Sequence, residues 1–383
     1  VPMIDIHTIG AGGGSIARVN SAGILQVGPE GAGGDPGSIC YRRGGQEPTI
    51  TDANLLLGRL NPAGLLGVDR TAQLDRIREI FDKKIGAHLG LNPDQVAGAI
   101  VRVANDKMAG AIRLVSLQRG HDARDFVLFA FGGAGPLHAV ALARELAIPR
   151  VLVPARPGIT SALGCLVADV RHDFVKTINQ GVLRLDVEAA HRILADQVDD
   201  APRLPAAEGV EVETVSVQHE ADMQFVGQTH VLTVTIPRTD FAREDLMSAF
   251  EKAYWERFEV ELREMRAQVV SLRTAVIGRR RPVSLEGLIA REAGGAATPA
   301  GHRRVWFDAG WQETSVYRRE ALGTGVALAG PAIVEQLDST TVIEPGDRMR
   351  VDALGNLEIT VRGVEAADRS PRPRPGGERE RGD

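Results

Sequence analysis

The chain has 383 residues, of which 43% are hydrophobic and 25% are charged. These proportions are typical of a globular protein of two or three domains and exclude a fibrous or wholly disordered chain. The net charge of −5 and the aromatic content of 4% argue against phosphate-driven binding and base stacking, so we expect no nucleic-acid partner. Glycine is the unusual component, because twelve of the 43 glycines lie within the first 45 residues.

The N-terminal segment is predicted to form a strand, a glycine turn and a hairpin. Residues 3–9 (MIDIHTI) are apolar and β-branched, and Gly10–Gly14 interrupt them. A hairpin is expected over residues 16–27, and residues 28–48 form a long loop that is either functional or disordered. The first ten residues lack the basic region of a signal peptide and resemble the interior of a domain. We therefore expect the chain to be a fragment or a processed product.

Residues 70–178 show the alternation of helices and strands that is typical of an α/β fold. Apolar residues at helical spacing predict a helix over 70–90 and a second one to about Gly120, which Asn92 caps and Pro93 begins. The following elements are expected to be a buried strand at 126–131, a helix at 137–146, a strand at 151–153 and a short helix at 161–168. Residues 1–178 are thus predicted to form one domain.

The uncharged run at 126–143 (FVLFAFGGAGPLHAVALA) has the minimum length of a membrane span. Glycines and Pro136 occupy its middle, where they would break a helix. We therefore interpret it as a buried strand, a tight turn and a helix, and we expect no membrane association.

The C-terminal half is predicted to contain two further domains and a tail. A mixed α+β domain is expected over 179–290, with helices at 186–199 and 240–262, strands at 210–217, 231–236 and 269–276, and a hinge at 202–209. Residues 279–300 are polar and glycine-rich and are interpreted as a linker. Short strand patterns predict a β-rich module over 300–363. Residues 364–383 contain almost no apolar residues and are predicted to form a disordered tail.

The two cysteines, Cys40 and Cys165, are far apart and belong to no metal-binding motif. They cannot form a disulfide framework, so the expected compartment is a reducing cytoplasm. No base is placed beside either cysteine by the sequence, so a nucleophilic role is not favoured.

The first glycine loop, GAGGGSIA, contains the spacing of a dinucleotide-binding fingerprint at Gly12, Gly14 and Ala17. That fingerprint requires a helix directly after it, whereas a hairpin is predicted here, and the Gly-Lys-Ser/Thr of a P-loop is absent. What remains is a strand end with successive glycine amides and the hydroxyl of Ser15. These groups can form an anion-binding concavity, and a bare tight turn is the alternative.

The second glycine loop, FGGAGPLHA, joins the end of a strand to a helix that begins near Pro136. The first amides of that helix and its positive dipole face whatever lies in the turn, and Gly132, Gly133 and Gly135 allow a flat ligand to approach the backbone. Packing of the helix on the strand is an equally good interpretation.

Several polar residues are candidates for chemistry. Asp5 and His7 lie two residues apart, so both would point to one face of the predicted strand, as a metal site, as a catalytic pair that orients water, or as a hydrogen-bonded pair. Asp52 and Asn54 suit a helix cap or a contact to metal or substrate. For His121, Asp122 and His138 a solvated turn and helix packing are favoured.

Seven segments together resemble the hydantoinase/oxoprolinase family, the A-type subunits of ATP-dependent cyclic-amide hydrolases. They are IDIHTIGAGGGSIARV, VGPEGAGGDPGSICYRRGGQEPTITDANLLLGRL, ANDKMAGAIRLVSLQRGHDARDF, FGGAGPLHAVALA, PGITSALGCLVADVRHD, ADMQFVGQTHVLTV and GPAIVEQLDSTTVI. They occur in family order over roughly residues 3–360, which makes the joint pattern far more specific than either glycine loop.

The resemblance implies an α/β fold: the second lobe of an actin-like (ribonuclease H-like) ATPase, followed by a mixed α+β and β-rich C-terminal region. It implies that Gly12, Gly13, Gly14 and Ser15 bind the phosphates of ATP and that Gly132, Gly133 and Gly135 bind its adenosine. Mg²⁺ or another divalent metal is expected with the nucleotide, and Asp5, His7 and Asp52 are its candidate ligands. Asp5 and His7 are also the candidate catalytic residues.

The chain departs from the family pattern in three places. The N-terminal lobe with its Asp-Gly-Gly-Thr phosphate loop is absent from the sequence, and with it the residue that usually orients magnesium. Arg42 replaces a glycine in YRRGG, and Gln224-Phe225 replaces the usual Arg-Tyr. These two replacements put the substrate contacts in doubt.

The activity that the resemblance implies is ATP-dependent hydrolysis of a hydantoin, 5-oxoproline or a lactam. ATP would phosphorylate the carbonyl oxygen, and a B-type hydantoinase subunit would complete the hydrolysis. Two alternatives stay open: a subunit of the acetone or acetophenone carboxylase type, which phosphorylates a ketone enolate, and a catalytically incomplete scaffold.

Overall fold

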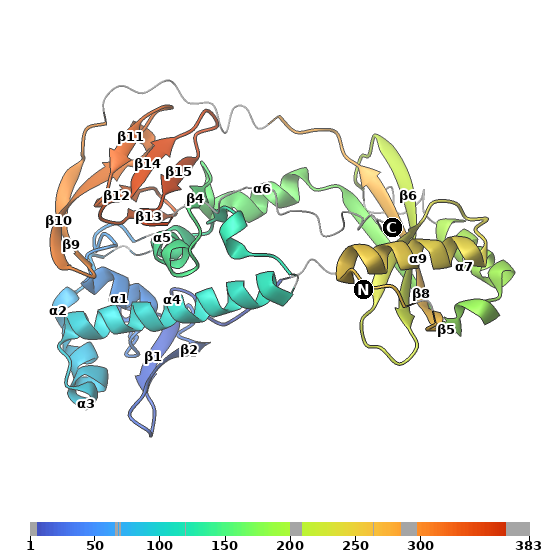
Figure 1. The fold of residues 1–383 in the computed structure, drawn as a ribbon. Coiled ribbons are helices and arrows are strands. Elements are labelled where there is room, and N and C mark those ends of the chain that lie inside the picture. Colours follow the sequence, from blue (N-terminus) through green and yellow to red (C-terminus); the bar gives the residue numbers. More distant parts are fainter. Residues whose placement is uncertain are drawn as a thin grey trace, which may run out of the picture. The chain divides into compact units, whose positions relative to one another are not determined.

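The computed structural model describes residues 6–364 except 66, 67, 69, 119, 200–208, 263 and 285–296. The chain divides into two compact units (Figure 1). We call residues 7–161 with 285–383 the large unit, and residues 1–6 with 162–284 the small unit. The predicted hinge, linker and tail lie wholly or mostly outside the described residues.

The large unit begins with the hairpin that the sequence predicts. Strands β1 (Ser15–Val19) and β2 (Leu25–Gly31) pair antiparallel. The side chain of Asn20 accepts hydrogen bonds from the amides of Ala22 and Ile24 and thereby closes the turn. The hairpin prediction is confirmed, although the second strand runs four residues further than expected.

Helices pack against this hairpin to form the first core of the large unit. The elements are α1 (Ile50–Leu56), α2 (Leu74–Phe81), a π-helical turn (Asp82–Gly86), α3 (Ala87–Leu89) and α4 (Pro93–Gln118). Their apolar stripes meet in one buried cluster that includes Ile77, Phe81 and Ile100. Asn92 caps α4 as predicted, because its Oδ1 accepts from the amide of Gln95.

The second core of the large unit is built on a five-stranded sheet in the order β11-β14-β15-β4-β3. Its strands are β3 (Leu128–Phe129), β4 (Arg150–Val153), β11 (Ala327–Ala329), β14 (Arg348–Val351) and β15 (Leu357–Thr360). Helix α5 (Gly135–Glu145) packs on it. Helix α6 (Thr160–Val167) follows β4, and all but its first two residues belong to the small unit.

Strand β15 pairs antiparallel with β4, which lies about 200 residues earlier in the chain. Strands from residues 300–363 therefore share a sheet with strands from the segment 128–153. The sequence had instead suggested that residues 300–363 form a β-rich module of their own. The physical reason is that Leu357 and Ile359 bury the same face as Val151 and Val153.

The predicted buried strand at 126–131 is shortened to the two residues of β3. It lies at the edge of the sheet, and its one partner among the described strands is β4, with which it pairs in parallel. Phe126, Phe129 and Phe131 are about half exposed as a result, so the expectation of a buried strand is wrong here. An edge strand lacks the neighbour that would cover its second side.

A four-stranded sheet in the order β13-β12-β10-β9 completes the large unit. It comprises β9 (Gly301–Phe307), β10 (Gly310–Arg318), β12 (Ala332–Glu335) and β13 (Thr340–Ile343). Leu137 of α5 joins its apolar face. The buried Glu335 pairs with both Arg303 and Arg318 across the strands.

In its described residues, the small unit is an antiparallel sheet in the order β5-β8-β6-β7 with helices beside it. Its elements are β5 (Val170–Gly181), β6 (Thr214–Phe225), β7 (Leu232–Ile236), β8 (Ala267–Arg279), α7 (Val187–Asp199) and α9 (Arg243–Phe258). Its core is centred on Phe225, Phe250 and Tyr254, whose rings meet edge to face. Short 3₁₀ helices of the two units occur at Ile39–Tyr41, Ala123–Asp125, Pro157–Ile159, Val182–Arg184 and Arg319–Ala321.

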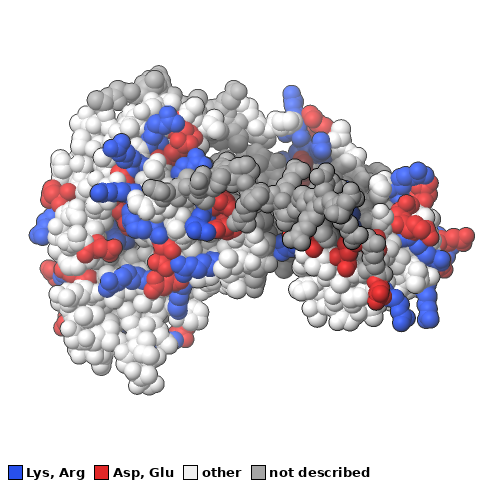
Figure 2. Space-filling view, viewed as in Figure 1, with Lys and Arg blue, Asp and Glu red and all other residues white. Residues whose placement is uncertain are grey.

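None of the helices described is both long enough and apolar enough to cross a membrane. Basic and acidic side chains alternate over the face of the molecule drawn in Figure 2.

Candidate functional site

The first glycine loop is held in a closed turn by Ser15. The Ser15 hydroxyl accepts a hydrogen bond from the amide of Gly12 at 2.9 Å and donates one to the carbonyl of Gly10 at 3.0 Å. The amide of Ser15 in turn donates to the carbonyl of Gly12 at 2.9 Å. Ser15 therefore shapes the loop from within and is itself buried.

The first turn of helix α1 contacts this loop. The amide of Thr51 donates to the carbonyl of Gly13 at 2.8 Å, and a Cβ on Gly13 would lie 2.7 Å from the Thr51 hydroxyl. Cβ atoms on Gly12 and Gly14 would instead meet no atom within 4 Å. Within the described residues the amides of Gly13 and Gly14 donate to no acceptor. The loop thus presents unpaired amides beside open space, which is the arrangement that binds oxyanions.

Asp52 fixes the long loop that follows the hairpin. Its carboxylate is completely buried and accepts hydrogen bonds from the amides of Ile39, Cys40 and Thr49 and from the Thr49 hydroxyl. Thr49 and Asp52 form the capping box of α1. Burial raises the pKa of Asp52 above its ordinary value, and these hydrogen bonds act against that shift.

The contacts of Asp52 are those of the helix-cap alternative, and its role as a metal ligand remains a prediction. Asp5 lies outside the described residues. His7 is exposed, and residues 6–9 form no strand. The described part of the chain contains no group of three or more His, Cys, Asp or Glu side chains that could hold a metal ion. The roles of Asp5 and His7 remain predictions.

The second glycine loop is tied to two neighbouring turns. The amide of Gly132 donates to the carbonyl of Pro157 at 2.7 Å, and the Ser339 hydroxyl lies 3.3 Å from the carbonyl oxygens of Gly132 and Gly133. Gly132 has a φ of +80°, which favours glycine. Gly135 begins α5, and no side chain caps the first amides of that helix. Pro136 has no N–H and the amide of Leu137 donates to the carbonyl of Ala134 at 3.1 Å, so the amide of Gly135 is the one that can donate to a ligand oxygen.

Asp338 is a residue near this loop that sequence reasoning missed. Its carbonyl oxygen lies 3.2 Å from the position of a Cβ on Gly133, and its side chain occupies the space that a Cβ on Gly158 would need. Its Oδ1 is buried without a hydrogen-bond partner in the described structure. A buried carboxylate oxygen with no donor is a place where a ligand hydroxyl or amino group can bind.

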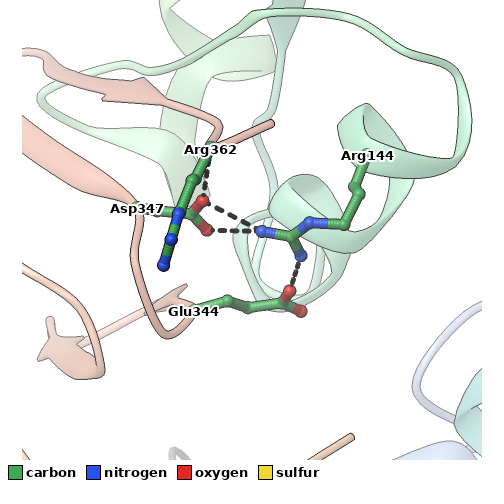
Figure 3. Close-up of polar contacts among 4 residues, drawn as sticks. All are labelled: Arg144, Glu344, Asp347 and Arg362. Carbon is green, nitrogen blue, oxygen red and sulfur yellow. Dashed lines mark hydrogen bonds and ion pairs between the residues drawn. The ribbon is translucent and has the colours of Figure 1, made fainter. Parts of the chain in front are cut away.

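Helix α5 is anchored at its far end by the ion-pair network in Figure 3. The guanidinium of Arg144 donates two hydrogen bonds to Asp347 at 2.9 Å and pairs with Glu344. The backbone amide of Arg362 also donates to Asp347. This network joins the helix of the second glycine loop to the turn between β13 and β14.

The remaining candidates have structural contacts. His138 is buried, and its Nδ1 lies 2.7 Å from Oδ1 of Asn105. Burial, together with the charge of Arg59, lowers the pKa of His138 to about 4. His121 packs edge to face on Phe126. Cys40 and Cys165 are both unpaired, and burial raises the pKa of the Cys40 thiol.

Two models of one protein family match most of the chain. Hydantoinase/oxoprolinase matches residues 1–174, and the hydantoinase/oxoprolinase C-terminal domain matches residues 184–359. The chain belongs to the hydantoinase/oxoprolinase family.

Curated relatives are about twice as long as this chain or longer. Caprolactamase subunit alpha of Pseudomonas jessenii is 34% identical over 378 residues, covering 94% of this chain and 53% of the relative. The acetophenone carboxylase gamma subunit of Aromatoleum aromaticum is 32% identical over 390 residues, covering 97% and 52%. 5-Oxoprolinase 1 of Arabidopsis thaliana is 30% identical over 381 residues, covering 94% and 30%.

Solved structures confirm the predicted α/β fold. The crystal structure of ATP-dependent caprolactamase from Pseudomonas jessenii superposes with a TM-score of 0.77 at 32% identity and covers 94% of this chain and 53% of that one. Nucleotide-free acetone carboxylase gives a TM-score of 0.71 at 24% identity, covering 92% and 52%. The second likeness concerns the fold alone.

Proposed function

We propose that this chain supplies the nucleotide-binding part of an ATP-dependent hydrolase that opens a cyclic amide such as a hydantoin, 5-oxoproline or a lactam. The proposal depends on the two backbone amides of Gly13 and Gly14, which donate to no acceptor in the described structure. These amides lie beside Gly12 and Gly14, where an added Cβ would meet no atom within 4 Å. Membership of a family that includes caprolactamase and 5-oxoprolinase supports the choice of reaction.

In this proposal the first loop holds the phosphates of ATP. Its amides offer fixed donors to phosphate oxygens, and the Ser15 hydroxyl keeps the turn closed, so little reorganisation is needed when the nucleotide binds. The second loop holds the adenosine. There the amide of Gly135 at the start of α5 supplies a donor, and the unpartnered Oδ1 of Asp338 supplies an acceptor.

The reaction uses ATP to make an amide oxygen into a leaving group. A P–O bond forms between the γ-phosphorus and the carbonyl oxygen of the amide, while the bond from that phosphorus to ADP breaks. Water then attacks the activated carbon, and the ring C–N bond breaks as the nitrogen takes up a proton and leaves as the amine, which gives an acyl phosphate. A second water molecule hydrolyses this acyl phosphate and releases the carboxylate and inorganic phosphate. Phosphoryl transfer depends mainly on positioning and charge neutralisation, which fixed amides serve well.

A divalent metal and a partner subunit belong to the same proposal. Mg²⁺ would neutralise phosphate charge, but no cluster of metal-binding side chains occurs among the described residues, so we assign it no ligand and no step. A B-type subunit is expected because the named relatives include an alpha and a gamma subunit.

The second candidate function is phosphorylation of a ketone enolate before carboxylation. The 32% identity with the acetophenone carboxylase gamma subunit favours it to a similar degree. Both reactions place the same demand on the glycine loops, because both transfer the γ-phosphoryl group to an oxygen atom.

ATP turnover by the assembled enzyme separates the two candidates. We expect release of ADP to depend on 5-oxoproline, hydantoin or caprolactam, and to be unaffected by acetone or acetophenone with bicarbonate. Turnover with a ketone alone would overturn the choice of a cyclic amide.

A further inference from the structure

A pocket of about 600 Å³ opens in the large unit between the end of α1, the middle of α4, α5 and β9. Its lining contains no residue of either glycine loop. A second pocket of about 250 Å³ adjoins it and shares Arg59, Arg144, Phe307, Asp308 and Glu344.

Arg59 is the most unusual group in this pocket. It is 8% exposed, yet its Nε has no hydrogen-bond partner and its guanidinium forms no ion pair with any described carboxylate. Asp308 is close enough to favour the charged form, but burial dominates and lowers the pKa of Arg59 to about 10. The side chain therefore remains a buried cation at neutral pH. Arginine is rarely buried without a partner, and its guanidinium carries five N–H donors. We therefore expect a ligand in this pocket that accepts hydrogen bonds from Arg59.

Hydrogen bonds to strand β9 fix the position of the backbone around Arg59. The amide of Trp306 donates to the carbonyl of Leu57 at 2.9 Å, and the Arg303 guanidinium donates to the carbonyls of Gly58 and Arg59. Gly58 has a φ of +72°, and a Cβ there would lie 2.2 Å from the carbonyl oxygen of Arg304. The contact of α1 with β9 thus holds Arg59 at the pocket.

Asn105 places a second set of donors at the same pocket. Its Oδ1 faces Nδ1 of the buried His138 at 2.7 Å. His138 is neutral near pH 7 because its pKa is about 4, so its Nδ1–H donates to Asn105. That bond orients the amide, and the Nδ2 of Asn105, which donates to no described residue, is left for a ligand.

The rest of the lining narrows the class of ligand. Leu57, Val101 and Trp306 give the pocket an apolar wall. The acidic groups at its edge are either paired, as Glu145 is with Arg113, or exposed, as Asp106 and Asp308 are. These exposed carboxylates oppose the entry of a multiply charged phosphate, and the exposed Arg102 of the same lining offsets them only in part. A single carboxylate on an apolar body meets Arg59 and Asn105 without that penalty, and a guanidinium binds it through two parallel hydrogen bonds.

We propose that this pocket binds a small organic monocarboxylate, whose carboxylate is held by Arg59 and the Asn105 amide and whose apolar body lies against Trp306. The site is independent of the proposed nucleotide site, because the two share no residue.

The binding test is calorimetric titration of the full 383-residue chain with benzoate and hexanoate, using 1-hexanol and inorganic phosphate as comparison ligands. We expect saturable binding of a carboxylate and at least tenfold weaker binding of both comparison ligands. Arg59→Gln should weaken carboxylate binding roughly ten- to a hundredfold. Arg304→Gln is the matched control, because Arg304 is an exposed arginine of β9 next to Trp311, and it should bind as the unchanged chain does.

A measurement without ligand tests the same idea when Arg59→Gln alone is ambiguous. An unpaired buried cation destabilises the free protein, so Arg59→Met should raise the melting temperature by about 2–5 °C. It should also abolish the rise that the carboxylate causes in the unchanged chain. If Arg59 has only a structural role, Arg59→Met should instead lower the melting temperature. The proposal is overturned if Arg59→Met melts lower than the unchanged chain, if Arg59→Gln binds carboxylate equally well, or if neither carboxylate binds.

Discussion

The hydroxyl of Ser15 lies 2.9 Å from the amide nitrogen of Gly12 and accepts its hydrogen bond. The same hydroxyl donates to the carbonyl of Gly10, so one side chain closes the glycine turn from both sides. The turn therefore keeps its shape without a ligand, and the amides of Gly13 and Gly14 remain available. Such preorganisation lowers the cost of ordering a loop when a phosphate binds.

Removal of that hydroxyl should loosen the loop without unfolding the protein. Ser15→Ala leaves the Gly12 amide unpaired in a partly buried place, so we expect a loss of about 1 kcal/mol in unfolding free energy and several-fold weaker binding of Mg·ATP. Denaturant unfolding and nucleotide titration measure the two effects. Ser116→Ala is the control, because its hydroxyl bonds only within helix α4. Equal nucleotide affinity for Ser15→Ala and the unchanged chain would count against this role.

Asp52 should matter far more for stability than an ordinary helix cap. Asp52→Ala removes the acceptor of the Ile39, Cys40 and Thr49 amides, so we expect a loss of about 3 kcal/mol or more. Asn92→Ala removes the exposed cap of α4 and should cost only about 1 kcal/mol. Urea unfolding of both variants tests the difference. Similar losses would show that the bonds to the long loop contribute little.

His138 should make the protein less stable as the pH falls. Its pKa is about 4 in the folded protein against an ordinary value of about 6.5, so below pH ~6.5 the unfolded chain binds a proton that the folded chain does not. Stability should therefore fall between pH ~6.5 and ~4, with roughly 2 kcal/mol lost between pH 7.5 and 5.

The check is the pH dependence of urea unfolding for the unchanged chain and for His138→Gln. Contributions from all other titrating groups are common to both proteins, so the difference between the two slopes belongs to His138. Parallel curves would refute the depressed pKa.

The network around Arg144 should be costly to break. Arg144→Met leaves the completely buried carboxylate of Asp347 with the Arg362 amide but without its cation, so we expect a loss of about 3–5 kcal/mol. Arg350→Met breaks an exposed pair with Glu358 and should cost less than about 1 kcal/mol. Thermal unfolding of the two variants gives the comparison. A small effect of Arg144→Met would mean that the turn between β13 and β14 holds α5 by packing alone.

Local patterns in the sequence predicted most helices and strands correctly, because apolar spacing and caps act over a few residues. The hairpin, helix α4 with its Asn92 cap, and strand β7 follow directly from such patterns. Strand β5 was missed because its twelve residues are mostly polar and partly exposed, and only pairing with β8 makes them a strand.

The sequence alone did not indicate which distant segments of the chain pair as strands. Nothing in residues 357–360 indicates that they pair with 150–153, and the half-exposed edge at Phe129 follows from that strand order. Arg59 and Asp338 were missed for the same reason, since burial and the absence of a partner are properties of the assembled fold. For Asp52 the sequence indicated the helix cap, but it did not indicate the hydrogen bonds from the amides of Ile39 and Cys40.

The central claim, that the first glycine loop binds the phosphates of ATP, is tested most directly by titrating Mg·ATP into Gly14→Ala. A methyl group on Gly14 meets no protein atom within 4 Å, so the fold should be unchanged while the space beside the free amides is filled. The titration is made on the chain and on its assembled complex, with Gly110→Ala as the control, because that glycine lies in α4 and is equally unobstructed. We predict at least tenfold weaker binding for Gly14→Ala and unchanged binding for Gly110→Ala. Equal affinity of Gly14→Ala and the unchanged protein for Mg·ATP would contradict the claim.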